Sequence, residues 1–113
     1  MISSLLLEKC KFYFELFSKK DLEELSHLFS DDIVLRDWET LAIGKKEVIA
    51  ANKNIFESLD NIQVKLLNQS LSDNNRVYNQ IIIEINNKET LLVIDVIVFD
   101  ENGLIKKIEA YKG

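Results

Sequence analysis

The stretch Leu91-Leu92-Val93-Ile94-Asp95-Val96-Ile97-Val98-Phe99 decides the fold of this chain, because every position but one is apolar. A strand that faces water on one side alternates between apolar and polar residues, so a strand without that alternation is covered on both faces. The exception is Asp95, in the middle of the run. A carboxylate at this position loses its water, and it must find hydrogen-bond partners or stay protonated. The group that Asp95 faces is therefore the main question about function.

Four strands joined by hairpins are predicted in the second half of the chain, and the run around Asp95 is the third of them. They span about residues 62–71, 76–86, 89–99 and 104–111. In the first strand, Leu66-Leu67 breaks the alternation and indicates a bulge. A tight turn is expected at Asn87-Lys88, and Asn102-Gly103 between two apolar runs is a strong hairpin signal.

Three helices and one strand are predicted before this sheet. The helices span about residues 3–17, 22–29 and 45–60, and the strand spans 33–38. In each helix the apolar residues recur three or four positions apart, whereas in the strand they alternate. Asp21 with Glu24 three residues later predicts an N-cap with its reciprocal partner for the second helix. A short loop is expected between the strand and Gly44.

This order of elements predicts an α+β fold, in which helices pack on one face of a curved, mostly antiparallel sheet. The 113 residues suit one domain, residues 1–113, and 47% of them are apolar, which is enough for a core. Fourteen basic and nineteen acidic residues give a net charge of −5 without a basic stripe, so nucleic acid is not an expected partner. Neither a signal peptide nor a membrane span is expected, and the cytoplasm is the predicted location.

The single cysteine and the single histidine have no companions that would give them chemistry. Cys10 lies among apolar residues and is interpreted as a buried small side chain. His27 lies between Ser26 and Leu28, and a solvated or capping role is expected for it. With one residue of each type, we expect no metal site.

The strand around Asp95 also has a second apolar face. Leu92, Ile94, Val96 and Val98 point away from the face that Asp95 shares. If the helices cover the Asp95 face, this face needs another cover, and an exposed apolar face of that size marks an interface. We therefore expect a homodimer joined through this face by a two-fold contact.

Three stretches carry a resemblance to a known family. They are Tyr13–Leu22, Leu28–Asp32 followed by Asp37, and Ile94–Phe99 followed by Gly103 and Ile105. They are similar to the end of the first helix, the second helix with the first strand, and the last hairpin of the ketosteroid isomerase-like, SnoaL-like branch of the nuclear transport factor 2-like superfamily. The resemblance covers nearly the whole chain. It implies a cone, in which a bent sheet wraps round three helices and leaves a pocket between them.

The resemblance also implies roles for three side chains. In the steroid isomerases of this family, a tyrosine and a protonated aspartic acid donate hydrogen bonds to the carbonyl oxygen of the substrate, and an aspartate moves the proton. The tyrosine falls on Tyr13, the proton-moving aspartate on Asp37 and the protonated acid on Asp95. The chemistry of the residues agrees, because proton abstraction beside a carbonyl needs a base and donors that stabilise the enolate. All three residues lie on otherwise apolar faces, where the pKa of a carboxyl rises.

Further residues are candidates for the pocket lining. They are Trp38, Asn52, Phe56 and Phe17. Trp38 stands where the steroid isomerases commonly have proline, and we expect it at the rim of the pocket. Structural roles stay open: Tyr13 as a core tyrosine, Asp95 as its hydrogen-bond partner, and Asp37 as a solvated strand end or a partner of a nearby basic residue.

Three functions follow from these alternatives. The first is an enzyme that acts on a small hydrophobic carbonyl compound by proton transfer, either an isomerase or a polyketide-cyclase-like catalyst, without a cofactor. The second is a module that binds such a ligand without turnover. The third is a dimerisation or accessory domain.

Overall fold

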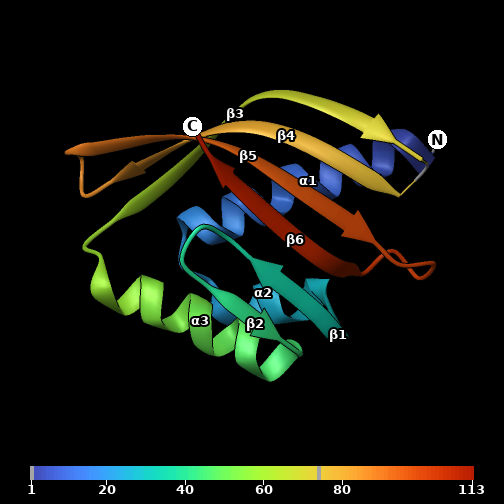
Figure 1. The fold of residues 1–113 in the computed structure, drawn as a ribbon, viewed down its shortest axis with the longest axis horizontal. Helices are drawn as coiled ribbons and strands as arrows, with labels where there is room; N and C mark the ends of the chain where they lie inside the picture. Colours follow the sequence, from blue (N-terminus) through green and yellow to red (C-terminus); the bar gives the residue numbers. More distant parts are fainter. Residues whose placement is uncertain (1, 74) are drawn as a thin grey trace.

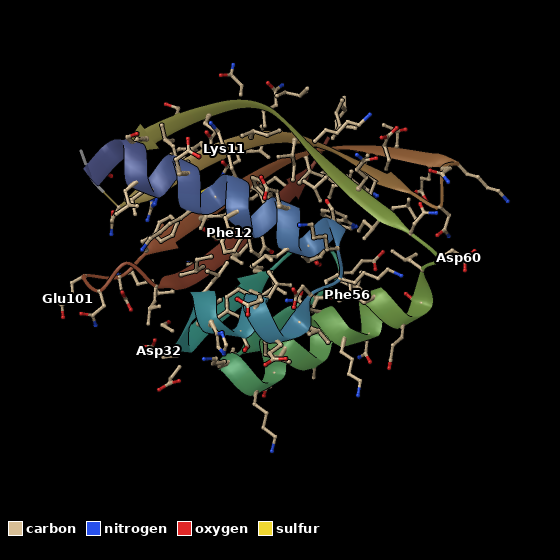
Figure 2. The ribbon with its side chains drawn as sticks, turned by 180° about the vertical axis from the view of Figure 1, so that it is seen from behind. Lys11, Phe12, Asp32, Phe56, Asp60 and Glu101 are labelled. Atoms are coloured by element: carbon tan, nitrogen blue, oxygen red, sulfur yellow. The ribbon has the colours of Figure 1, made fainter. Side chains whose placement is uncertain are left out.

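A computed structural model describes residues 2–73 and 75–113, and Figure 1 shows the arrangement of its elements. In chain order they are α1 (Ile2–Ser18), α2 (Leu22–Leu28), β1 (Phe29–Arg36), β2 (Leu41–Ile43), α3 (Lys45–Ser58), β3 (Ile62–Ser72), β4 (Arg76–Ile85), β5 (Glu89–Phe99) and β6 (Ile105–Lys112). The predicted α+β class is confirmed, because three helices lie against one face of a curved sheet (Figure 2). None of the helices described is long and apolar enough to cross a membrane.

The sheet has six strands in the order β2-β1-β6-β5-β4-β3. The strands β3 to β6 form a meander of antiparallel neighbours, as predicted. The strand β1 pairs with β6 in parallel, and β2 pairs with β1 in antiparallel at the edge. The long strand β5 therefore lies inside the sheet, between β4 and β6.

The core lies between α1 and the concave face of the sheet. In α1 the buried residues recur at helical spacing, among them Leu6, Cys10 and Tyr13, whereas Phe12 is 45% exposed on the outer side (Figure 2). On β5 the inner residues Val93, Ile97 and Phe99 are buried. Asp95 lies on this same face and is 6% exposed, so the carboxyl group is buried as expected.

The start of the sheet differs from the prediction. The strand β1 begins at Phe29 and not at Ile33. The helical spacing of the leucines had assigned Phe29 to the second helix. The short strand β2 lies where a loop was expected. Three residues are too few to show a period, so the pattern could not reveal this strand. The N-cap at Asp21 is confirmed, but its backbone N–H donates to the Leu16 oxygen at 3.0 Å, so the reciprocal bond is not made.

The turns of the meander largely agree with the prediction. The register between β3 and β4 shifts between Leu66 and Asn68, which confirms the bulge. Gly103 has a φ of +79°, and this left-handed conformation is the reason for glycine in the β5–β6 hairpin. The turn between β4 and β5 lies one residue earlier than predicted, because Asn86 and Asn87 have the positive φ angles.

The outer face of β5 is apolar over only part of its length. Leu92 and Ile94 are 58% and 37% exposed, as predicted. Val96 and Val98 were expected to be exposed too, and this is wrong, because they are 6% and 3% exposed. Their partners across the strands include Tyr78, Arg76, Lys107 and Glu109. These long side chains share the outer face with the valines and flank them, so part of the face is covered from within the sheet.

Candidate active site

A cavity of about 380 Å³ lies between the helices and the concave face of the sheet. Its volume is at the low end of the range for small-molecule sites, about 300–1,000 Å³. Most of its lining is apolar and comes from α1, α3 and the inner faces of the strands. Tyr13, Asp37 and Asp95 all contribute to this lining. The structure therefore brings the three predicted residues to one cavity.

Asp95 and Tyr13 are deeply buried titratable groups of this cavity, with 6% and 5% exposure. Burial, and then the negative charge of Asp37, raise the pKa of Asp95 from 3.8 to about 7. Burial, followed by the charge of Asp95, raises the pKa of Tyr13 well above its ordinary value. Both groups therefore favour the protonated form, in which each can donate a hydrogen bond.

Asp37 is half-buried just beyond the end of β1, and a turn of the backbone fixes its carboxylate. Its Oδ1 atom accepts hydrogen bonds from the backbone N–H groups of Glu39 at 2.8 Å and Thr40 at 2.7 Å. Its own N–H donates to the Thr40 oxygen at 2.9 Å. These bonds orient the carboxylate and leave Oδ2 without a partner within the described residues. Such an oxygen can accept a proton from a ligand.

A purely structural role for Tyr13, Asp37 or Asp95 would require a hydrogen bond or an ion pair to a neighbouring side chain. Among the described residues, no hydrogen bond joins the Tyr13 hydroxyl to the Asp95 carboxyl. The ion pairs within the same residues do not include Asp37 with Arg36 or Lys45. The Tyr13 hydroxyl, the Asp95 carboxyl and Oδ2 of Asp37 are thus left for a ligand or for water.

A buried amide network holds the strand behind Asp95. Asn79 is fully buried, and its Nδ2 donates to the backbone oxygen of Asp95 at 3.0 Å. Its Oδ1 accepts a hydrogen bond at 2.9 Å from Gln69, which also donates to the Leu7 oxygen at 3.1 Å. The network thereby links β5 through β4 and β3 to α1. Sequence reasoning missed it, although an asparagine on the apolar face of β4 was a signal that a buried amide needs partners.

Cys10 lies beside this network and acts as a small buried side chain, as predicted. It is 0% exposed, and burial raises the pKa of its thiol to about 12, while a hydrogen bond with Asn79 opposes the rise. A thiol in this state is a poor nucleophile. His27 is exposed and lies 4.0 Å from Glu24, in agreement with a solvated role. The described residues contain no group of three or more potential metal ligands.

The mouth of the cavity is lined by polar and charged residues that the sequence did not single out. They are Glu39, Thr40, Ser58, Glu89 and Lys112. Trp38 is 41% exposed and lies at this mouth, as expected, with the Lys112 ammonium 5.4 Å from the centre of its ring. No pattern marks these residues, because loop and strand ends converge here only in the folded chain.

The remaining lining candidates differ in position. Phe17 and Asn52 both line the cavity. Phe56 does not belong to the lining, because its ring packs edge-on against Phe17 at 4.8 Å and is buried between α1 and α3 (Figure 2). Phe56 therefore supports the wall of the cavity from behind.

The sequence pattern of the SnoaL-like domain matches residues 11–108. This match spans most of the chain, and the chain belongs to the SnoaL-like family. The predicted resemblance is thereby confirmed. A comparison with curated proteins found no match.

Solved structures share the fold at low sequence identity. A protein from Shewanella denitrificans, assigned as a SnoaL-like polyketide cyclase, is 14% identical with a TM-score of 0.85, over 96% of this chain and 90% of that chain. A protein from Agrobacterium tumefaciens, assigned as an isomerase of the SnoaL-like family, is 12% identical with a TM-score of 0.81, over 95% and 96%. SalBIII, an epoxide hydrolase/cyclase-like enzyme in pyran ring formation in salinomycin, is 15% identical with a TM-score of 0.80, over 100% and 95%. At these identities the likeness shows the fold alone.

Proposed function

We propose that this protein binds a small hydrophobic carbonyl compound in the cavity and catalyses proton transfer at the carbon beside the carbonyl group. One observation carries the proposal: a single apolar cavity holds two aspartates in different surroundings. Asp95 is buried with a pKa of about 7, whereas Asp37 is half-buried and bound by two backbone N–H groups. A buried carboxyl with a strongly raised pKa, in a cavity that holds a second carboxyl group, is a signature of acid–base chemistry.

The proposed reaction begins with Asp37. Its Oδ2 removes a proton from the carbon beside the carbonyl, and the electrons of the C–H bond form the carbon–carbon double bond of an enolate. The hydroxyl of Tyr13 and the protonated carboxyl of Asp95 donate hydrogen bonds to the enolate oxygen, where the negative charge develops. In a β,γ-unsaturated ketone the enolate extends to the γ carbon, and protonated Asp37 returns the proton there, which moves the double bond and completes an isomerisation. In a cyclase, the enolate carbon instead attacks a second carbonyl carbon, and protonated Asp37 gives its proton to the alkoxide oxygen that forms. The proposed steps need neither a cofactor nor a metal.

Binding of 2-naphthol, whose hydroxyl oxygen mimics that of an enolate, tests the proposal. Calorimetry at pH 6 compares wild type with Tyr13→Phe and Asp95→Leu, each of which lacks one donor. A hydrogen bond that involves partial charge contributes about 1.5–3 kcal/mol, so each variant should lose about tenfold or more in affinity. An absence of binding to wild type, or equal affinity in all three proteins, contradicts the proposal.

Turnover separates an enzyme from a binding module. A β,γ-unsaturated cyclic ketone serves as the probe substrate, and its conversion to the conjugated isomer is followed by ultraviolet absorbance. Conversion that depends on Asp37 supports the enzyme. Tight binding of 2-naphthol without conversion would instead support the module that binds a ligand without turnover.

A second copy of this chain is the proposed partner at the outer face of the sheet. Tyr78, Leu92, Ile94 and Tyr111 are each 37% exposed or more on this face. A two-fold contact would bury the same patch of both copies. Light scattering at micromolar concentration tests it, with Ile94→Lys as the disrupting variant, and a monomeric wild type overturns it. We also expect a cytoplasmic location and no nucleic-acid partner, in agreement with the net charge of −5.

A further inference from the structure

The side chain of Asn52 is a buried amide whose N–H donor is left unpaired by the described residues. Asn52 is 2% exposed and lies on α3 with its side chain in the lining of the cavity. Its Nδ2 atom is buried and has no partner within the part of the chain that the structure describes. Asn79, the other buried asparagine on the inner side of the sheet, uses both ends of its amide. The described residues thus provide hydrogen-bond partners for the amide of Asn79 and none for Nδ2 of Asn52.

Leaving a buried N–H group unsatisfied is costly, with a penalty of about 1–3 kcal/mol. Each such group in a folded protein therefore needs an explanation. Packing alone does not require an amide at this position, because leucine has the same branched skeleton of four heavy atoms and would suit the apolar neighbours. The open amide is explained if its partner is a molecule that enters the cavity.

The position of Asn52 defines where that partner would lie. Asn52 and Ile55 lie three residues apart on one face of α3, Leu59 directly follows the helix, and all three line the cavity wall. Exposure rises along this wall, because Asn52 is buried and Ile55 and Leu59 are partly exposed. Asn52 therefore lies at the inner end of the α3 wall. Tyr13 and Asp95 approach the cavity from α1 and β5, on different elements.

The chemistry of the amide restricts the ligand. An uncharged N–H donor pairs with an oxygen that accepts a hydrogen bond, such as that of a hydroxyl or a carbonyl group. A charged group would not suit this position, because the surrounding wall is apolar and the amide cannot neutralise a charge. The ligand would then carry two separate oxygens on an apolar skeleton.

We propose that Asn52 determines substrate specificity, by binding a second, uncharged oxygen of the ligand while Tyr13 and Asp95 bind the first. The proposal rests on the proposed function and narrows its substrate class to carbonyl compounds that carry a further hydroxyl or carbonyl group. The described residues leave the N–H donor of Asn52 unpaired, and a ligand with only one oxygen would leave it unpaired too.

Binding of naphthalene diols tests this proposal. Calorimetry measures the affinity of 2-naphthol and of a set of naphthalene diols, in which the second hydroxyl occupies each position of the other ring. Wild type should prefer at least one diol over 2-naphthol by about fivefold, which is the effect of one net hydrogen bond of about 1 kcal/mol. Asn52→Leu should lose this preference, measured as the ratio of the diol affinity to the 2-naphthol affinity, because both ligands then meet the same altered wall.

Thermal unfolding of the empty protein provides a readout that a structural role would not produce. Asn52→Leu should raise the melting temperature by about 3 °C, because it removes an unsatisfied buried amide. The matched control is Asn54→Leu, the same substitution at an exposed position of α3, which should change neither the preference for a diol nor the melting temperature. A lower melting temperature for Asn52→Leu would overturn the proposal.

Two further results overturn it and identify which proposal fails. If wild type binds 2-naphthol and the diols equally, or if Asn52→Leu keeps the preference, the role of Asn52 is wrong while the proposed function stands. If wild type binds neither 2-naphthol nor any diol, the proposed function fails, and the role of Asn52 fails with it.

Discussion

The inner end and the mouth of the cavity each hold one aspartate, and the two carboxyl groups differ in burial and in hydrogen bonding. Asp95 lies in the middle of β5, on the face whose residues Val93, Ile97 and Phe99 are buried, and its pKa rises to about 7. Asp37 lies in a turn after β1, where two backbone N–H groups bind one of its oxygens. The comparison teaches that burial raises the pKa of one carboxyl, whereas a short turn fixes the orientation of the other.

Removing the acceptor at the mouth should have the largest effect. Asp37→Asn keeps Oδ1, which the Glu39 and Thr40 N–H groups need, and removes the base. Proton transfer on the unsaturated ketone should slow by about 10²–10⁴-fold, whereas the affinity for 2-naphthol should change little. Absorbance assays give the rate and calorimetry the affinity. A rate within tenfold of wild type would remove Asp37 from the mechanism.

The pH dependence of stability sharpens the contrast at the inner end. The folded protein holds the Asp95 proton up to pH about 7, whereas the unfolded chain releases it near 3.8. Between these values unfolding releases a proton, so stability falls as pH rises and then stays level above pH about 7. A shift of about three pKa units corresponds to about 4 kcal/mol.

Asp95→Asn is the reference for this measurement, because its amide does not titrate. Urea unfolding at several pH values should show wild type losing stability relative to Asp95→Asn between pH 4 and 7. In an Asp37→Asn background the window should end at a lower pH, because the charge of Asp37 is one cause of the shift. A difference that is constant with pH would show that Asp95 is ionised in the folded protein.

The end of α3, close to the mouth of the cavity, is bound by Lys20, which lies between α1 and α2. The Lys20 ammonium donates to the backbone oxygens of Phe56 at 3.0 Å and Asp60 at 3.2 Å, and also to that of Leu59. Lys20→Met should lower the free energy of unfolding by about 1–2 kcal/mol, because these helix-end carbonyls lose a cation. Lys19→Met, at the exposed neighbouring position, should cost less than about 0.5 kcal/mol. Equal losses in urea unfolding would contradict a specific role of Lys20.

The smallest effect is expected where the mouth is most exposed. Lys112→Met removes the cation above the Trp38 ring, and an exposed contact of this kind contributes about 0.5–1 kcal/mol. Lys106→Met, at an exposed position on the same strand, provides the control for loss of charge. Urea unfolding should show the larger loss for Lys112→Met. A loss of more than about 2 kcal/mol would mean that the mouth is a rigid part of the fold.

The sequence predicted the parts of the fold whose signal is long and repeated. The strand around Asp95 has apolar residues on both sides, so burial of its carboxyl followed from the pattern alone. The β1–β6 pairing could not be predicted, since neither strand carries a mark of its partner. The strand β2 was too short to show a period.

The candidate site could be predicted only at the level of residue types. The pattern and the family resemblance placed Tyr13, Asp37 and Asp95 in one pocket, and the structure brings all three to the cavity. The turn that binds Asp37 depends on backbone atoms of Glu39 and Thr40, which no side-chain pattern encodes. The open amide of Asn52 depends on which neighbours fail to reach it, and only the packed structure contains that information.

The place of β6 in the sheet has a consequence for folding during synthesis on the ribosome. The strand β6 lies between β1 and β5, so these two have no hydrogen-bonded link before residues 105–112 have emerged. The nascent chain can form the β3–β5 meander early, whereas β1 can pair with β6 only after that strand has been synthesised. Such distant pairing slows folding, because the intervening chain must first be closed into a loop. Ile108 and Ala110 of β6 also line the cavity, so the binding site for a ligand is complete only after β6 has emerged.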